Sequence, residues 1–327
     1  MIVSKTPLRL SLAGGGSDLP SFYTQESGSV VNFTINKYVY IACHNLYSKG
    51  IRLSYSRTEN VNSVDEIVHP LIREVFRKLE FNLDVEVGSF ADVPATGTGL
   101  GSSSSFTVGL INSLSNFCGN RFSKRQLAEL ACEIELERCK EPIGKQDQYA
   151  AAFGGINSFT FHTDGTVSVF PVSDDGVHNM LNSSLILYDL GYGRKSSDIL
   201  RNQSIAMLKA ESFNKVKKLR ELVSPMILAL ETKNISLVAD VIRESWEYKK
   251  EITEGISNAS IAELHEIALQ KGALAGKVVG AGGGGFLLLV VEPEKREWFK
   301  KSFKLLSELK FEVSQTGSEI VLNDELT

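Results

Sequence analysis

The chain has 327 residues, of which 43% are hydrophobic and 23% charged; this composition is ordinary for a folded protein, and the length favours two domains. The net charge of −4 and the lack of a long basic run argue against a surface for nucleic acid. The longest wholly apolar run, 286–291, is too short to cross a membrane, and the first residues lack an apolar segment of signal-peptide length, so we expect a cytoplasmic protein with no membrane partner.

The first ninety residues are predicted to form mainly strands. Apolar and polar residues alternate up to Leu12, and the alternation stops at Gly14, Gly15 and Gly16, which predicts a strand followed by a tight loop. A helical period predicts one helix at 64–79. We expect further strands at 51–54 and at 83–87. The segment 29–43 should form one or two more.

The stretch 92–108 combines three alternate glycines with four serines, Ser102–Ser105, and then an apolar helical pattern. Glycine adopts positive φ, so successive amides can face one concavity, and serine caps a helix or offers a hydroxyl to an anion or a metal. A helix N-terminus after such a loop is a natural phosphate site. A flexible linker is the alternative, but linkers do not run directly into a helix of about 14 residues. The stretch has no Walker lysine. The charge of a phosphate bound there should therefore be neutralised by backbone amides, by Mg²⁺ and by cations from other parts of the chain.

The remainder of the chain predicts an α+β fold, with helices on one side of an antiparallel sheet. A capping box at Ser123 should start a helix that ends before Pro142, and a hairpin should follow at 156–172. The pattern loosens at 174–176, so we divide the chain into domains 1–178 and 179–327. In the second domain we expect strands at 184–189, 276–279 and 285–291, helices near 198–212, 213–232, 235–250, 259–271 and 294–309, and two short final strands.

Two further segments could contribute to a binding or catalytic site. Gly280–Gly285 matches GxGxxG, but a dinucleotide site must open a helix, and here a buried strand follows. A flexible turn is one alternative; we favour a close approach of this backbone to a substrate or to another glycine loop, because so many glycines are costly in unfolded-state entropy. Asp147 is predicted in a loop between a helix end and a run of small residues, where a carboxylate is usually a cap. Glu135, twelve residues earlier, is a candidate metal ligand.

The segments 6–18, 94–105 and 277–286 resemble, in this order, the three motifs of the GHMP small-molecule kinases, and the resemblance covers nearly the whole chain. It implies a two-domain α+β architecture, with an N-terminal domain like ribosomal protein S5 domain 2, a ferredoxin-like C-terminal domain and the site between them. Within the family, TPLRLSLAGGGSDLPSFY and EPIGKQDQYAAAFGG are most similar to the D-glycero-D-manno-heptose 7-phosphate kinases.

The resemblance also implies a role for each matched residue. Asp147 would act as general base or orient the acceptor hydroxyl, Arg9 would lie near the reacting centre, and Ser103 and Glu135 would bind Mg²⁺. The ATP phosphates would contact Pro94, Gly97, Thr98, Gly99, Leu100, Gly101, Ser102, Ser103 and Ser104. Asp18 would hydrogen-bond the hydroxyls of the sugar. Beyond the matched positions, we expect further acceptor contacts at Gly15, Gly16, Lys145, Gln146, Arg194, Lys195, Ser197, Gly282 and Gly283.

Two features of the sequence influence which substrate we expect. Galactokinases carry Glu-His where this chain has Gly15-Gly16, which argues against galactose and leaves space for a bulkier sugar. A phosphorylated acceptor also needs cations, for which Arg194 and Lys195 are the candidates, although an exposed basic turn with a serine cap is an equal alternative.

We therefore expect an ATP- and Mg²⁺-dependent kinase that converts D-glycero-D-manno-heptose 7-phosphate into the 1,7-bisphosphate. The product would feed nucleotide-activated heptose for surface glycans such as capsule or lipopolysaccharide. The alternatives are another anomeric sugar kinase, such as an L-fucose kinase, and a catalytically inactive sugar sensor with the same fold. A monomer and a homodimer are both compatible with the sequence.

Overall fold

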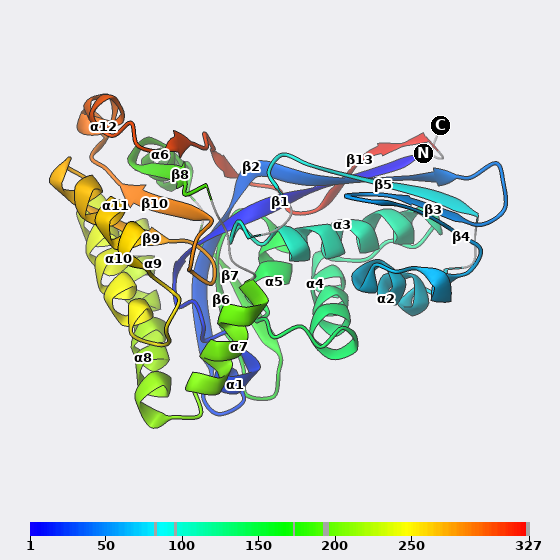
Figure 1. The fold of residues 1–327 in the computed structure, drawn as a ribbon, viewed down its shortest axis with the longest axis horizontal. Helices are drawn as coiled ribbons and strands as arrows, with labels where there is room; N and C mark the ends of the chain where they lie inside the picture. Colours follow the sequence, from blue (N-terminus) through cyan, green and yellow to red (C-terminus); the bar gives the residue numbers. More distant parts are fainter. Residues whose placement is uncertain (82–83, 95–96, 173, 192–195, 325–327) are drawn as a thin grey trace.

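Two β-sheets organise the chain (Figure 1). The computed structural model describes residues 1–81, 84–94, 97–172, 174–191 and 196–324. Within these residues the larger sheet has nine strands: β1 (Ile2–Ala13), β2 (Gly28–Asn45), β3 (Ile51–Ser54), β4 (Thr58–Val61), β5 (Val85–Ala91), β6 (Ile156–Phe161), β7 (Val167–Pro171), β12 (Val313–Ser314) and β13 (Glu319–Asn323). The smaller sheet comprises β8 (Leu185–Asp189), β9 (Ala275–Val278), β10 (Phe286–Val290) and β11 (Ser307–Glu308).

Strands β1 and β2 form the centre of the larger sheet. The first part of β2 pairs with β6 and its last part with β5, so this strand of 18 residues belongs to two sets of neighbours. The antiparallel pairing of β1 with β2 shifts register between Pro7 and Leu8 and again between Ser11 and Ala13. Such bulges bend a strand and re-aim its side chains. Arg9 and Ser11 lie between the two shifts.

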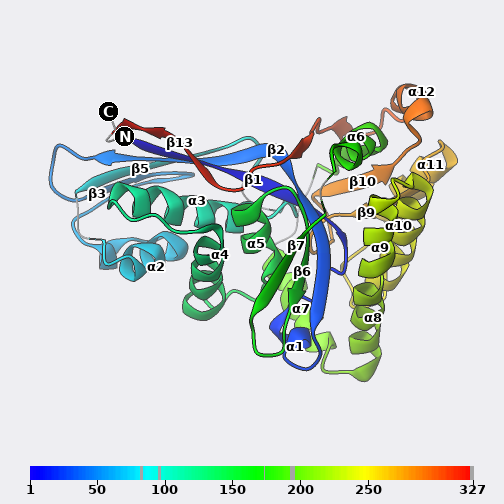
Figure 2. The ribbon, with the colours of Figure 1, turned by 180° about the vertical axis from the view of Figure 1, so that it is seen from behind.

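Four helices cover one face of the larger sheet, as Figures 1 and 2 show from opposite sides. They are α2 (Pro70–Lys78), α3 (Ser102–Phe117), α4 (Lys124–Cys132) and α5 (Gln146–Phe153). A π-helical segment, η2 (Glu133–Arg138), continues α4. Helix α3 packs on both β1 and β2, and almost all of its residues are buried, which explains why its sequence is apolar or small on every side.

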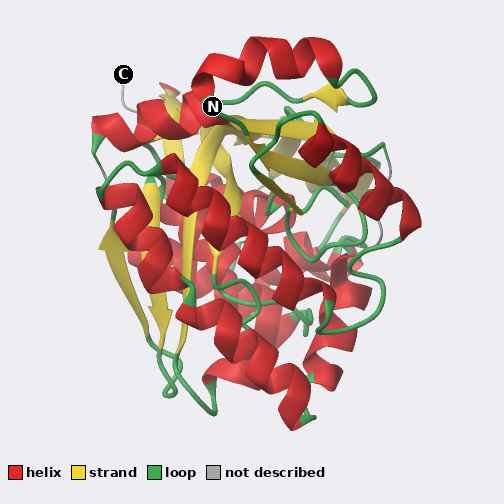
Figure 3. Ribbon diagram, turned by 90° about the vertical axis from the view of Figure 1, so that its left-hand side faces the viewer, coloured by secondary structure: helices red, strands yellow, loops and turns green. Residues whose placement is uncertain are grey.

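A second group of helices packs on the smaller sheet and on one end of the larger one (Figure 3). It includes α8 (Ala210–Glu221), α9 (Val223–Glu231), α10 (Ile235–Lys250) and α11 (Ala259–Gln270). Helix α10 contacts β9 and also β1, so it connects the two sheets. The remaining helices are α1 (Pro20–Tyr23), α6 (Asp175–Ser184), α7 (Ser196–Ala206), α12 (Arg296–Ser302) and the short 3₁₀ turns η1 (Val64–Glu66) and η3 (Pro293–Lys295).

The end of the chain returns to the first sheet. Strand β13 pairs with β1, and β12 pairs with β2, both antiparallel. The division of the chain at residue 178 stays a prediction, and these two pairings connect the last residues of the second half with the first strands. In the described part of the chain, no helix has the length and apolar character needed to cross a membrane.

Most of the predicted elements are confirmed. The strand at 51–54 and the helix at 235–250 have the predicted bounds, and the hairpin forms as β6 and β7. The capping box at Ser123 is present, with Gln126 as its partner, and α11 stops before Gly272, whose φ is +96°. The segment 29–43 is one strand, not two. The α+β class is also confirmed.

Other predictions were wrong at the level of single elements. The helix at 64–79 begins only at Pro70, because a proline tolerates just the first turn of a helix. The helix at 294–309 ends at Ser302, and 307–308 belongs to β11. Helix α6 occupies the segment where the pattern loosens, with Asp174 as its cap, and Asp147 lies in the first turn of α5, not in a loop. The strand β4 was missed.

Candidate active site

A cavity of about 390 Å³ brings together segments from the whole chain. It is lined by β1, by the loops 15–19 and 97–101, by the first turn of α3, by 141–147, by α7 and α10, and by 277–281. The three glycine-rich segments of the sequence therefore border one space.

The loop 97–101 is held by close contact with the glycine-rich segment after β9. A Cβ atom at Gly99 would lie 2.6 Å from the carbonyl oxygen of Val279, and one at Gly285 would lie 2.6 Å from that of Thr98. Both glycines also have positive φ, +70° and +84°. Any side chain here would overlap backbone atoms, so the predicted approach of 280–285 to another glycine loop is confirmed.

Helix α3 begins at this loop. Its N-cap is Gly101, with φ +76°, and no side chain caps the helix, so the expectation that a serine serves as the cap is wrong. The serines lie inside the first turn, where the backbone amides have no partner within the helix. Ser102, Ser103 and Ser104 all line the cavity. The first turn therefore offers free amides and hydroxyls to an anion.

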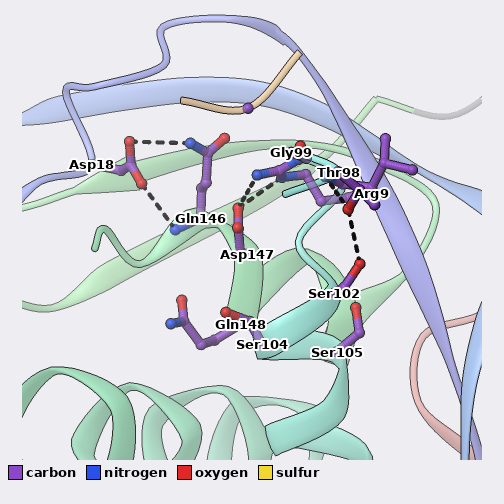
Figure 4. A network of polar contacts seen from close by, with 12 residues as sticks. Arg9, Asp18, Thr98, Gly99, Ser102, Ser104, Ser105, Gln146, Asp147 and Gln148 are labelled. Carbon is purple, nitrogen blue, oxygen red and sulfur yellow. Dashed lines mark hydrogen bonds and ion pairs between the residues drawn. The ribbon is translucent and has the colours of Figure 1, made fainter. Parts of the chain in front are cut away.

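Arg9 and Asp147 form an ion pair beside Gly101 (Figure 4). Both Nε and Nη2 of Arg9 lie 2.7 Å from Oδ1 of Asp147, and Nη1 donates to the carbonyl of Gly99 at 2.5 Å. The Arg9 side chain is 5% exposed and that of Asp147 25%. Within the described residues, Oδ2 of Asp147 accepts no hydrogen bond. One carboxylate oxygen is therefore fixed, and the other is available at the cavity.

Asp18 lies on the other side of Asp147 (Figure 4). Its Oδ1 accepts from the amide of Gly16 at 3.0 Å and from Nε2 of Gln146 at 3.2 Å, and its Oδ2 accepts from the Gln146 amide at 3.4 Å. Burial and the nearby charge of Asp147 raise the pKa of Asp18 to about 6. A Cβ atom at Gly144 would overlap Oδ2 of Asp18. The position of this carboxylate therefore depends on glycine at 144.

Glu135 is completely buried in the π-helical segment η2. Its carboxylate accepts hydrogen bonds from the hydroxyls of Ser103 at 3.2 Å, Ser104 at 2.8 Å and Thr107 at 3.1 Å, and from the amide of Gln148. Burial raises the pKa of Glu135 to about 7. Single π-helical turns are frequent at functional sites.

The residues fit Mg²⁺ only together with a nucleotide. Among the described residues, no group of three or more His, Cys, Asp and Glu side chains could hold a metal ion. Mg²⁺ in phosphoryl-transfer enzymes is usually held by one or two protein oxygens, by substrate phosphates and by waters. Ser103 lines the cavity, and its hydroxyl donates to the Glu135 carboxylate; Glu135 itself is buried behind Ser103 and does not line the cavity, so its role as a Mg²⁺ ligand stays a prediction.

The cavity gathers most of the predicted site residues and leaves others outside. Those that line it are Arg9, Gly15, Gly16, Asp18, Gly97, Thr98, Gly99, Gly101, Ser102, Ser103, Ser104, Gln146, Asp147 and Ser197. Leu100 is buried beneath the loop, and its carbonyl accepts from the Arg9 amide, whereas Pro94 is exposed outside it. Lys145 points to the carbonyl of Gly165, and Gly282 and Gly283 pack on Ile256. Arg194 and Lys195 lie outside the described residues.

Sequence reasoning missed residues on the helical wall of the cavity. Gln203 of α7 and Ser245 and Lys249 of α10 line it, and Gln203 packs on Gly16. No local pattern distinguishes these positions from other polar residues on helices. Lys277 also lines the cavity; it lies within the third glycine-rich motif, which is the one signal that could have identified it.

A glycine loop at a helix N-terminus, facing a carboxylate and a cation across a small cavity, is typical of an enzyme that transfers a phosphoryl group. Comparisons with known proteins agree. A family model of the GHMP kinases N terminal domain matches residues 66–155, and one of the GHMP kinases C terminal region matches 226–304. The chain belongs to the GHMP kinase family and is an ATP-dependent sugar kinase.

Several relatives are similar over almost the whole chain. A D-glycero-alpha-D-manno-heptose 7-phosphate kinase of Campylobacter jejuni is 30% identical over 90% of this chain and 91% of its own. The crystal structure of a D-glycero-D-manno-heptose 1-phosphate kinase from Bacteroides thetaiotaomicron has a TM-score of 0.82, with 28% identity over 99% of both chains. An L-fucokinase/L-fucose-1-P guanylyltransferase of Bacteroides fragilis is 22% identical over 89% of this chain, which spans 35% of that protein.

Proposed function

We propose that this kinase transfers the γ-phosphoryl group of ATP to the anomeric hydroxyl of D-glycero-D-manno-heptose 7-phosphate and releases the 1,7-bisphosphate. The observation that carries the proposal is the position of Asp147 between two different polar walls of one cavity. Ser102 and the start of α3 lie on one side of it, and Asp18 with Gln146 on the other (Figure 4). A donor and an acceptor bound to these walls would meet at Asp147.

The donor side would bind the phosphates of ATP. The loop 97–101 and the first turn of α3 would supply backbone amides, and the Ser103 hydroxyl and Glu135 would hold Mg²⁺, which would neutralise part of the phosphate charge. Phosphoryl transfer depends mainly on positioning and on charge neutralisation. The segment 279–285 packs directly against this loop.

Asp147 would act on the acceptor. Its free oxygen, Oδ2, would accept the proton of the anomeric hydroxyl while the hydroxyl oxygen forms a bond to the γ-phosphorus and ADP leaves. Arg9 orients the carboxylate through two hydrogen bonds to Oδ1, and it is itself anchored to the carbonyl of Gly99 in the nucleotide loop. This anchor links the position of the base to that of the donor.

The acceptor side would bind the sugar. Above a pH of about 6 the Asp18 carboxylate is ionised, and it would accept hydrogen bonds from sugar hydroxyls. Gly15 contributes no side chain to this part of the cavity and leaves space for a long sugar, whereas Gln203 fills the space beside Gly16. Support for a phosphorylated heptose also comes from the Campylobacter jejuni relative, whose name specifies this acceptor. Arg194 and Lys195, which precede Ser197 in the chain, stay candidates for the sugar phosphate. The product would supply nucleotide-activated heptose for surface glycans.

The second candidate is an L-fucose kinase, because fucokinase proteins are among the relatives of this chain. Initial rates of ADP formation with a panel of heptoses and hexoses, each with and without its terminal phosphate, separate the two. We expect the highest kcat/KM with the heptose 7-phosphate. A protein that turns over L-fucose but no phosphorylated heptose would refute the proposed acceptor. Loss of turnover in Asp147→Asn, with nucleotide binding retained, would show that the measured rate belongs to this site.

A further inference from the structure

Two lysines on the wall of the cavity have no part in the phosphoryl transfer proposed for Asp147. Lys249 lies in the last turn of α10, and Lys277 lies on β9. Both line the cavity together with Arg9. Arg9 is paired with Asp147, whereas within the described part of the chain neither lysine has a carboxylate within 4.0 Å. The cavity therefore contains two lysines for which the described residues provide no counter-ion.

Both lysines are held by backbone carbonyls. The ammonium group of Lys277 donates to Leu12 at 2.7 Å, and that of Lys249 donates to Gly280 and, at 3.5 Å, to Val278. An ammonium group has three hydrogens, so these bonds leave donors for a ligand. Burial lowers the pKa of Lys249 to about 8, and burial with the charges of Lys249 and Arg9 lowers that of Lys277 well below its usual range.

A structural role alone does not account for these charges. Removing an ammonium group from water without a counter-ion is unfavourable, and a neutral side chain would fill the same space. Lys250, the next residue along α10, shows the usual arrangement: it pairs with Glu247 at 2.8 Å. Lys249 is partly exposed like Lys250 but has no such partner among the described residues, and Lys277 is buried. An anionic ligand in the cavity would supply the charge that Lys249 and Lys277 lack.

The position of the pair favours the acceptor side. Lys277 is bonded to Leu12, two residues before the loop Gly14–Gly16, and the carboxylate whose charge acts on Lys249 is Asp18. The serines that would bind the nucleotide lie across the cavity at α3. Gly280, which accepts from Lys249, also touches Gly99 of the nucleotide loop, so a phosphate of ATP is the alternative ligand.

We propose that Lys249, with Lys277 beside it, binds the phosphate group that the acceptor already carries and thereby selects a phosphorylated sugar. This inference rests on the proposed function. It assigns the specificity of the kinase for a phosphorylated acceptor to two residues. Hydrogen bonds between charged groups are about twice as strong as neutral ones, which makes such a pair an effective discriminator.

The test compares Lys249→Met and Lys277→Met with the matched control Lys250→Met. We expect KM for the phosphorylated heptose to rise about 10- to 100-fold in the first two variants, with KM for ATP and the rate with unphosphorylated heptose unchanged. Lys250→Met should behave like the wild type. An increase in KM for ATP with KM for the acceptor unchanged would assign the lysines to the donor and overturn the proposal, as would unchanged kinetics in both variants.

A binding measurement separates failure of this inference from failure of the proposed function. In the presence of saturating Mg²⁺ and ADP, inorganic phosphate should raise the melting temperature of the wild type and of Lys250→Met, but not that of Lys249→Met, because only a ligand that binds the folded state stabilises it. If the wild type used no phosphorylated sugar, the proposed acceptor would be refuted, while this difference in melting temperature would still show a phosphate site at Lys249. Equal stabilisation of all variants would refute the site itself.

Discussion

Gly144 offers a sharp test of the acceptor side, because it limits the space around Asp18 without contributing a side chain. In Gly144→Ala the new methyl group would overlap Oδ2 of Asp18, and the carboxylate would have to move. The φ of Gly144 is not in the left-handed region, so alanine introduces no backbone strain there. The methyl group would also lie 2.9 Å from the backbone carbonyl oxygen of Asp18, so the perturbation is centred on this one residue.

The magnitude follows from the hydrogen bonds that would be lost. Asp18 accepts three, two at Oδ1 and one at Oδ2. A movement that restores van der Waals contact breaks the Oδ2 bond and takes the carboxylate out of position, so the acceptor would lose its own hydrogen bond to this charged group, which contributes about 1.5–3 kcal/mol. We expect a loss of about 2–3 kcal/mol in acceptor binding, which corresponds to a rise in KM of roughly 30- to 150-fold.

The assay is steady-state kinetics with the acceptor and ATP varied in turn. KM for the acceptor should rise, and KM for ATP should not change, because Gly144 does not touch the nucleotide loop. Gly88→Ala in β5 is the control, since a Cβ atom there meets only the ring of Phe90 at an ordinary 3.5 Å. If KM for the acceptor were unchanged in Gly144→Ala, or if both KM values rose together, the assignment of Asp18 to the acceptor would be wrong.

Three other outcomes are expected. Asp147→Asn should lower kcat by about 10²- to 10⁴-fold, with ATP affinity retained in a binding titration; a fully active variant would contradict its role as base. Glu135→Gln should raise the Mg²⁺ concentration for half-maximal rate at least about tenfold, and an unchanged Mg²⁺ titration would remove Glu135 from the metal site. The pKa of Asp18 is raised from 3.8 to about 6, so the folded protein binds the proton more tightly than the unfolded chain, and its contribution to stability falls by about 3 kcal/mol as pH rises from about 4 to 6. Urea unfolding across this pH range should show a decline that is larger by this amount in the wild type than in Asp18→Asn, where the raised pKa of Glu135 still contributes, and parallel curves would refute the assignment.

Local sequence patterns predicted the parts of the site that depend on backbone conformation. Gly97, Gly99 and Gly101 and the helix after them could be placed because positive φ and helical periodicity are encoded in neighbouring residues. The strands β1, β2 and β3 could be placed for the same reason. The resemblance to a family then connected these glycines with Asp147 and Glu135, which no spacing in the chain links.

Contacts between distant segments could not be predicted. Lys249 is a polar residue near the end of an amphipathic helix, and only the packing of α10 against β9 and β1 brings it to the cavity. Helix α5 was missed because its run of alanines next to Asp147 has almost no amphipathic period, so tertiary burial and not pattern determines it. The pairing of β13 with β1 joins residues about three hundred positions apart, and nothing in either strand specifies the other.

The contact between the loop 97–101 and the segment 279–285 also has a consequence for biosynthesis. A ribosome makes the nucleotide loop long before it makes the glycines that hold that loop in place, and the strands that complete the larger sheet emerge last. A nascent chain that ended before residue 279 would contain every predicted ATP contact, yet its loop would lack the contact with these glycines and would be held only from the side of Arg9. Affinity for ATP should therefore appear late in synthesis. Its appearance would indicate that the two halves of the chain have packed together.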